Sequence, residues 1–302
     1  ETELISRFHA PRHPTLFIVG APRSGTTLLA QLLLMRFELG YINNVNARFW
    51  MAPYVGAVLA EALRNRSQPP DVGIDSEFGA TRGYEGPHEF GYFWRRWFRY
   101  GETHDAEDTK VRVRNGALLR RELAAVESVF DRPLLLKNLA CSFHVSFLAH
   151  ALPRAIFVHC RRNPVFAAQS ILLGRLKYHG DRMAWFSVKP AAYKRLRELP
   201  YPEQIAGQIA ATRGAVERQL AQLPATRQLC MEYETLCERP EEELERIAAR
   251  IAEHGHRPER RSVTLPAISP ANNPSVHPEE FEALRLACDR EFAAGVPRKE
   301  AQ

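Results

Sequence analysis

The chain has 302 residues, of which 45% are hydrophobic and 25% charged, so it can bury a sizeable core and is neither disordered nor fibrous. Its formal net charge of +6 is mild, and Lys and Arg are interleaved with Asp and Glu, which favours an anionic small molecule over a nucleic acid as partner. The apolar run from Leu28 to Met35 is too short to span a membrane, which takes about 18 residues.

The five cysteines form no CxxC pair and no Cys/His spacing typical of zinc. We therefore expect reduced thiols, a cytoplasmic location and no metal site. The sequence begins at Glu1, so a leader or an anchor ahead of this residue stays an open alternative.

Four short apolar runs predict buried strands, and each is followed by a stretch that predicts a helix. In chain order, the predicted strands and helices are 15–20 with 26–36, 133–137 with 143–151, 155–159 with 164–176, and 228–233 with 240–251. Two further helices are predicted at 204–223 and 278–292, and the tail between residues 255 and 278 is expected to be irregular.

Strands that alternate with helices indicate βα units on a mainly parallel sheet. The sequence therefore predicts an α/β fold of three layers, similar to a P-loop domain, with helices flanking the central sheet. We expect residues 1–302 to form a single domain, with an insertion at about 43–131 that shapes a substrate cleft over the carboxyl ends of the strands.

The first predicted strand runs into the sequence GAPRSGTT, Gly20 to Thr27, and then into an apolar helix. Such a turn aims backbone amides and the positive end of a helix at one point, which favours an oxyanion. The spacing of Gly20 and Gly25 equals that of a Walker A loop, but Thr26 stands in place of the lysine, and the cation is Arg23. No apolar strand ends in an aspartate that could hold magnesium. We expect a phosphate-like group to bind here without a metal, through Arg23, Ser24, Gly25, Thr26, Thr27 and Leu28.

A second candidate anion site follows the third predicted strand. Arg162 lies at the end of this strand, and Asn163 and Pro164 mark the start of the next helix as its cap and its first residue. Ser170 lies almost two turns further along, so an arginine fork and a hydroxyl can bind one phosphate together. Two anion sites on neighbouring strands predict a ligand with phosphates at both ends of a nucleoside.

These motifs resemble those of one known family. Segment 20–27 looks like the 5′-phosphosulfate loop of PAPS-dependent sulfotransferases, and Arg162 with Ser170, eight residues apart, looks like their 3′-phosphate motif. The segment MEYETL at 231–236, followed by Pro240, is similar to the YEDL-and-proline segment of many members. The resemblance is to the bacterial type and to the tyrosylprotein and carbohydrate branch, whose loop carries Arg, more than to the cytosolic phenol branch, whose loop carries Lys.

The resemblance implies an enzyme that moves the sulfuryl group of PAPS (3′-phosphoadenosine 5′-phosphosulfate) in line to a hydroxyl or an amine and leaves 3′,5′-adenosine bisphosphate (PAP), without a metal. The acceptor would be a small molecule, a saccharide or a lipid. Arg23 would neutralise the leaving phosphate. Lys137, at the end of the second predicted strand, matches a lysine that related enzymes place near the sulfuryl group.

The base that activates the acceptor is expected in the segment Gly86 to Glu89, which predicts a helix start with Pro87 near the first position. His88 would be kept neutral by the positive helix end, and Glu89 would be ionised, so either side chain is compatible with the role. Glu38 and Glu85 are weaker candidates.

Two departures from the family pattern are informative. The RKGxxGDW segment of the cytosolic branch is absent, which leaves the adenine contacts open, with Arg257, Arg260 and Arg261 either as substitutes or as a solvated basic loop. The glutamate that the tyrosylprotein branch carries after its loop would fall at Asn44. This difference argues against peptide tyrosine as the acceptor.

Other notable residues are expected mainly to pack. Packing explains the histidines His144, His150 and His159, and most of the aromatic residues Tyr92, Phe93, Trp94, Trp97 and Phe98, although one of these rings is a candidate to stack on an acceptor. Asn43, Asn46 and Arg48 are candidates to line the acceptor cleft. Two other functions stay open: a P-loop kinase of a small molecule, and a non-catalytic nucleotide-binding module.

Overall fold

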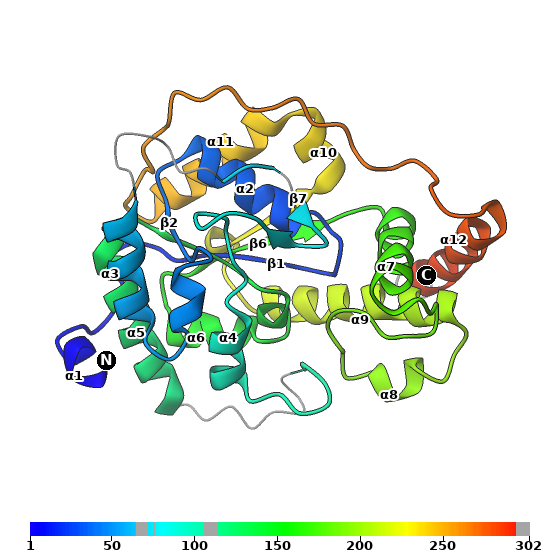
Figure 1. The fold of residues 1–302 in the computed structure, drawn as a ribbon, viewed down its shortest axis with the longest axis horizontal. Helices are drawn as coiled ribbons and strands as arrows, with labels where there is room; N and C mark the ends of the chain where they lie inside the picture. Colours follow the sequence, from blue (N-terminus) through cyan, green and yellow to red (C-terminus); the bar gives the residue numbers. More distant parts are fainter. Residues whose placement is uncertain (65–71, 75, 106–113, 294–302) are drawn as a thin grey trace, which may run out of the picture.

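The computed structural model describes residues 1–64, 72–74, 76–105 and 114–293, and Figure 1 shows a central sheet between layers of helices. The sheet has five parallel strands in the order β2-β5-β1-β6-β7. Their bounds are β1 Leu16–Gly20, β2 Gly40–Tyr41, β5 Leu134–Lys137, β6 Ile156–Arg161 and β7 Gln228–Glu232. The predicted α/β fold with a mainly parallel sheet is confirmed.

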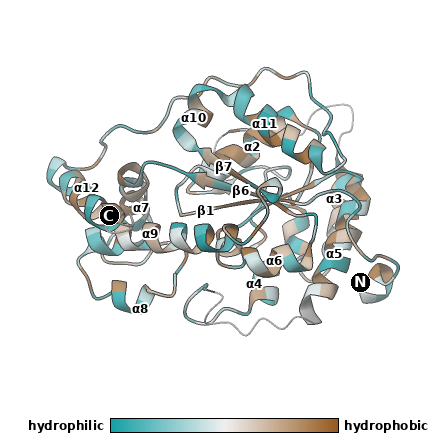
Figure 2. Cartoon of the chain, turned by 180° about the vertical axis from the view of Figure 1, so that it is seen from behind, coloured by the Kyte–Doolittle hydropathy of each residue, from teal (hydrophilic) through white to brown (hydrophobic). Residues whose placement is uncertain are grey.

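Helices cover both faces of the sheet, because its central strands bury apolar side chains on both sides. One face packs against α2 (Thr26–Arg36) and α11 (Pro240–Glu253), with α10 (Tyr233–Glu238) beside them. The helices on the other face are α4 (Gly91–Phe98), α5 (Arg114–Phe130), α6 (Val145–Ala151) and α9 (Tyr201–Leu220). Figure 2 shows the hydrophobic residues gathered in the strands and on the helix faces turned toward them.

Two more helices lie beyond the carboxyl ends of the strands. Helices α7 (Pro164–His179) and α12 (Pro278–Ala293) pack against each other and against α9. Between α11 and α12 the chain runs over the molecule without regular structure, as predicted. The remaining short elements are α1 (Thr2–Ile5), α8 (Tyr193–Leu196) and the 3-10 helices η3 (Leu139–Phe143) and η4 (Ala225–Arg227).

All predicted pairs of strand and helix are present, and their shifted ends have local causes. Helix α6 begins at Val145 rather than at residue 143, because Asn138 caps η3 with its side chain. The strand predicted at 155–159 extends to Arg161, which pairs with Glu232 of β7. Helix α9 begins at Tyr201, with Pro202 in its first turn.

The insertion contains elements that the sequence did not predict. They are η1 (Asn46–Phe49), α3 (Pro53–Leu63), α5 and a short hairpin of β3 (Ser76–Glu77) and β4 (Ala80–Thr81). The helix start predicted at Gly86 to Glu89 is wrong, since α4 begins at Gly91. Pro87 and His88 are instead extended, because the His88 amide donates to the carbonyl oxygen of Ile42 at 2.8 Å.

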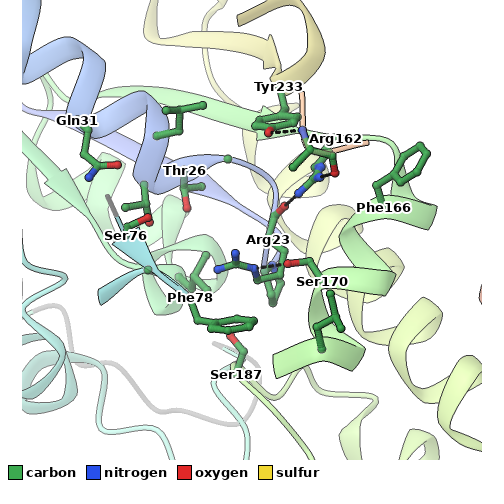
Figure 3. Close-up of a pocket in the computed structure, with 18 of the residues that line it drawn as sticks. Arg23, Thr26, Gln31, Ser76, Phe78, Arg162, Phe166, Ser170, Ser187 and Tyr233 are labelled. Atoms are coloured by element: carbon green, nitrogen blue, oxygen red, sulfur yellow. Dashed lines mark hydrogen bonds between the residues drawn. The ribbon is translucent and has the colours of Figure 1, made fainter. Parts of the chain in front are cut away.

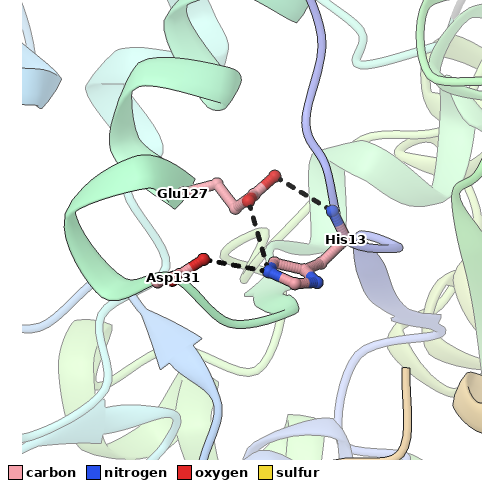
Figure 4. A group of neighbouring side chains, drawn as sticks. All are labelled: His13, Glu127 and Asp131. Carbon is pink, nitrogen blue, oxygen red and sulfur yellow. Dashed lines mark hydrogen bonds and ion pairs between the residues drawn. The ribbon is translucent and has the colours of Figure 1, made fainter. Parts of the chain in front are cut away.

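An ion-paired group ties the segment before β1 to the end of α5 (Figure 4). His13 Nε2 lies 3.2 Å from Asp131 Oδ1, and the His13 amide donates to Glu127 Oε2 at 3.2 Å. Because His13 precedes β1, this group lies at the amino ends of the strands. In the described ranges, no helix has both the length and the apolar composition needed to cross a bilayer.

Candidate active site

A cavity of about 560 Å³ opens at the carboxyl ends of the strands (Figure 3). Four strands contribute to its wall: the loop after β1, Lys137 at the end of β5, Arg162 after β6, and Tyr233 after β7. Open parallel sheets bind ligands at this edge, where the following helices present their amino ends. The two anion sites predicted from sequence therefore face one space.

The loop between β1 and α2 has a shape that requires glycine at two positions. A Cβ on Gly20 would lie 2.6 Å from the carbonyl oxygen of Cys160, and Gly25 has a φ of 88° and packs directly under the ring of Tyr233. Ser24 is buried, and its Oγ donates to a carbonyl oxygen of the same turn at 2.8 Å, so it braces the loop. The other residues predicted for this loop line the cavity: Arg23, Gly25, Thr26, Thr27 and Leu28.

Arg23 has a φ of 66°, a conformation that residues other than glycine seldom adopt. Its Nε donates to Oγ of Ser170 on α7 at 2.8 Å, and its guanidinium lies 4.9 Å from the ring centre of Phe78. Burial, and next the nearby charge of Arg162, lower the pKa of Arg23, although an arginine stays charged in a protein. Strained residues of this kind concentrate at functional sites.

Arg162 joins the second predicted anion site to the first. Its Nη1 donates to the carbonyl oxygen of Arg23 at 3.2 Å, and its guanidinium lies 4.4 Å from the ring centre of Tyr233. Figure 3 shows Arg23, Ser170 and Arg162 converging on one side of the cavity. The structure thus brings together three side chains that are up to 147 residues apart in the chain.

The irregular segment 262–277, which we name the C-terminal strap, crosses this side of the cavity. Arg162 Nη2 donates to the carbonyl oxygen of Ala271 at 2.5 Å, and the Ala271 amide donates to the hydroxyl of Tyr233 at 3.1 Å. The Ser275 amide donates to Gln169 Oε1 at 2.7 Å. The Asn272 side chain accepts from Arg162 Nε at 3.2 Å. Sequence reasoning missed these residues, because the backbone contacts leave no motif and a single asparagine in an irregular segment carries no spacing signal.

The arginines considered as substitutes for the missing C-terminal motif lie elsewhere. Arg257 and Arg260 form ion pairs with Glu245 at 3.7 and 2.8 Å, on α11. Arg261 lies 3.6 Å from the carboxylate of Glu38. None of the three is among the residues that line the cavity.

A second group of polar atoms meets beside the loop. Lys137 at the end of β5 pairs with Oε1 of Glu89, and the Asn138 side chain donates to the carbonyl oxygen of Glu89 at 2.9 Å. A Cβ on Gly79 of the β3–β4 hairpin would lie 3.4 Å from Glu89 Oε1, 3.6 Å from Thr27 Oγ1 and 3.7 Å from Lys137 Nζ. The carboxylate, the ammonium and the hydroxyl therefore face one point next to the amino end of α2.

Comparison with known families gives the same result as the motifs. A model described as the sulfotransferase family matches residues 14–253, which is more than half of the chain. The chain belongs to the sulfotransferase family.

This sulfotransferase is 31% identical over 166 residues to omega-hydroxy-beta-dihydromenaquinone-9 sulfotransferase Stf3 of Mycobacterium bovis and of Mycobacterium tuberculosis. The match covers 50% of this chain and 42% of each relative, so the chain matches less than half of their length. The solved sulfotransferase STF9 from Mycobacterium avium is 15% identical, with a TM-score of 0.58 over 100% of this chain and 80% of that one. This second likeness supports the fold.

The candidate bases of the sulfotransferase lie in different surroundings. Glu89 lines the cavity, whereas His88 contributes to a separate small pocket beside Thr27 and Lys137. His88 Nδ1 accepts a hydrogen bond from the Phe90 amide at 2.8 Å, and partial burial lowers the pKa of His88. This desolvation favours the neutral form of His88. The cause predicted from the sequence, the positive end of a helix, does not apply, because α4 begins only at Gly91.

The other predicted candidates do not line the cavity. Glu38 pairs with Arg132, and Glu85 is buried, with its carbonyl oxygen accepting from the Tyr41 hydroxyl at 2.9 Å. The side chains of Asn43 and Asn46 bond to backbone amides of their own turn. Arg48 is also outside the cavity wall.

Most of the aromatic residues of α4 belong to the core, as predicted: Phe93, Trp94, Trp97 and Phe98 are buried. Tyr92 is 68% exposed and lies against Trp50 rather than in the cavity. His144 and His159 are buried, and this burial lowers the pKa of each to about 3. His150 is exposed.

Proposed function

We propose that this sulfotransferase uses PAPS as its donor and transfers the sulfuryl group to a hydroxyl of its acceptor. The observation that carries the proposal is the pair of coupled anion sites, in which Arg23 bonds to Ser170 and Arg162 bonds to the backbone of Arg23. A nucleotide with a phosphate on each side of its ribose fits two such sites better than a nucleoside triphosphate, whose charge lies on one side.

The donor would occupy the side of the cavity that holds Arg23, Arg162 and Tyr233. Amides of the loop, with Arg23, Thr26 and Thr27, would bind the 5′-phosphosulfate at the amino end of α2. Arg162 and Ser170 would bind the 3′-phosphate. The cation of Arg23 stabilises charge that develops on the leaving phosphate, and it needs little reorganisation because Ser170 and Phe78 already hold its side chain.

Glu89 is the base that the geometry supports best. A neutral histidine whose Nδ1 accepts a hydrogen bond carries its proton on Nε2, so His88 has no free lone pair for the acceptor proton. Glu89 has a carboxylate on the cavity wall, beside the ammonium of Lys137. In the proposed step the acceptor oxygen attacks sulfur, its proton goes to Glu89, and the sulfur–oxygen bond to PAP breaks while Lys137 steadies the sulfuryl oxygens.

The proposal of a hydroxyl acceptor rests on the relatives. Stf3 is named for an omega-hydroxy compound, and it shares 31% identity with this chain over 166 residues. A hydroxyl is a weak nucleophile at neutral pH, so it needs a base such as Glu89 within reach.

The test measures binding and transfer separately. Calorimetry should show binding of PAP, and incubation with ³⁵S-labelled PAPS and a panel of hydroxyl compounds should label at least one acceptor without added magnesium. Transfer of phosphate from ATP and magnesium would instead establish the kinase alternative. Tight PAP binding with no labelled product from any acceptor would establish the non-catalytic binding module.

A further inference from the structure

The cavity has a second end, away from Arg162, and its wall there is apolar. The side chains are Phe78, Leu139, Leu173 and Phe186. They come from four separate places: the turn of the β3–β4 hairpin, the start of η3, helix α7 and the loop that follows it. Each is partly exposed, so each has surface free to contact a ligand.

An aromatic cluster fixes the outer side of this apolar end. The ring centres of Phe78 and Phe186 are 5.9 Å apart, and both rings contact Tyr178 of α7, at 5.4 and 5.6 Å. Phe78 also lies under the guanidinium of Arg23, which stands at the boundary with the donor side. The apolar end is therefore continuous with the place where the sulfuryl group would be transferred.

Phe186 is held in position by two features behind it. A Cβ on Gly174 of α7 would lie 2.8 Å from Cε1 of Phe186, so glycine at this position makes room for the ring. The fully buried Gln208 donates to the carbonyl oxygens of Phe186 and Val188 at 2.9 and 2.7 Å, which fixes the loop. A site whose wall is supported from behind in this way is already formed before a ligand binds.

Two charged side chains contact the Phe78 ring of this cluster: Arg23, as described, and Lys177, whose Nζ lies 5.9 Å from the ring centre. Lys177 and Arg82 line an open groove on the other side of the hairpin, where Lys177 pairs with Glu77. Inside, in the part of the wall that the structure describes, Glu89 and Lys137 pair with each other, Ser187 adds a hydroxyl, and Gln31 and Ser76 line the side away from Arg162 (Figure 3). Against the four apolar side chains themselves, a polyhydroxylated or charged group would lose water without gaining hydrogen bonds.

We propose that the apolar end binds the body of the acceptor, and that the acceptor is an uncharged alcohol whose hydroxyl is attached to an aliphatic or aromatic group. This inference rests on the proposed function, since it assigns the acceptor of the same reaction. The hydroxyl reaches Glu89 and Lys137, while the apolar group contacts Phe78, Leu139, Leu173 and Phe186. Removing apolar surface from water then drives binding, and a sugar placed against these four side chains would lose its hydration without compensation.

The experiment compares acceptors at fixed PAPS. Primary alcohols of increasing chain length and a simple phenol are assayed against glucose and glucose 6-phosphate, with transfer of ³⁵S as the readout. We expect kcat/KM to rise at least tenfold along the alcohol series, and to be at least a hundredfold lower for both sugars. A preference for glucose 6-phosphate would overturn the proposal and assign the acceptor to the groove of Arg82 and Lys177.

Variants behind and on the wall locate the effect. Gly174→Ala pushes Phe186 into the cavity, and Phe186→Ala removes its ring, so each should lower kcat/KM for the best alcohol at least tenfold. The matched control Arg82→Ala, in the outer groove, should leave this value within twofold. PAP affinity measured by calorimetry should be unchanged in all three. Alcohol kinetics that are equal in wild type and Phe186→Ala would refute the acceptor assignment, whereas loss of PAP binding by the wild type would refute the proposed function itself.

Discussion

The two ends of the cavity are built in different ways. At the donor end, polar side chains bond to one another and to backbone: Arg23 to Ser170, Arg162 to the loop and to the strap. At the proposed acceptor end, Phe78, Leu139, Leu173 and Phe186 offer apolar surface beside the ion pair of Glu89 and Lys137. A phosphate is bound by a few hydrogen-bond donors in fixed positions, whereas an apolar group is bound by an apolar surface of complementary shape.

The two ends also differ in the segments that build them. The donor end rests on the loop after β1 and the turn after β6, which the family pattern fixes. The acceptor end draws on a hairpin inside the insertion and on the loop after α7. Loops of this kind vary without disturbing the sheet. We therefore expect variants at the two ends to change different kinetic constants.

The largest effect is expected at the point where the two ends meet. Glu89→Gln keeps the shape of the side chain but removes the proton acceptor, so kcat should fall by about 10²- to 10⁴-fold, while PAP affinity stays within a factor of about two. Single-turnover transfer of ³⁵S and calorimetry measure the two quantities.

His88→Ala is the matched control for this variant. Its ring lies outside the cavity wall and its Nδ1 is already bonded, so kcat should change by less than about tenfold. If His88→Ala were inactive while Glu89→Gln kept its kcat, the base would be His88 and the tautomer assigned above would be incorrect.

The next effect concerns the donor end alone. Arg23→Ala removes a charge-assisted contact to the 5′-phosphate and the bond to Ser170, so the Kd for PAP should rise at least tenfold, which is about 1.4 kcal/mol or more. Arg23→Lys keeps the charge but cannot form a planar fork, and it should recover part of the loss. Equal Kd values for wild type and Arg23→Ala would show that the loop does not bind the donor.

The polar side chains of the proposed donor end could be singled out in the sequence, because an anion site constrains residue types. Arg23, Thr26, Arg162 and Ser170 were assigned from spacing and from neighbouring strands, and the structure places all four on one cavity. The contacts of the C-terminal strap were not predicted. Ala271 bonds to Arg162 and Tyr233 through its backbone carbonyl and amide groups, which almost every residue possesses.

The acceptor end was less predictable, for physical reasons. Leu139, Leu173 and Phe186 look in the sequence like ordinary core residues, and only the tertiary fold leaves them on a cavity. The helix start wrongly predicted at Gly86 shows the same limit. Pro87 favours a first helical turn, but the backbone bond from His88 to Ile42 keeps the segment extended.

A smaller effect is expected for the other half of the donor site. Arg162→Ala should raise the Kd for PAP about tenfold, because the 3′-phosphate loses a fork while the loop remains. Arg161→Ala is a matched control. Arg161 is next to Arg162 in the chain, but its side chain pairs with Glu232 outside the cavity wall. Its Kd should equal that of the wild type. Identical calorimetric values for Arg162→Ala and Arg161→Ala would remove the second anion site from the proposal.

The smallest effect is the pH dependence of folding stability that two buried histidines cause. His159 lies on β6, which leads to Arg162, and His144 follows η3, which carries Leu139. Burial lowers the pKa of each to about 3, below the value of about 6.5 expected in the unfolded chain. The unfolded chain therefore binds more protons below pH 6.5, so folding stability must fall as the pH falls.

When the pH falls from 7 to 6, proton uptake by each of these two histidines in the unfolded chain should lower the free energy of unfolding by about 0.7 kcal/mol. Urea titrations at the two pH values measure this change. His144→Leu should reduce this slope by the share of one histidine. A wild-type slope of zero would contradict this prediction, because His144 and His159 would then bind protons equally in the folded and in the unfolded chain.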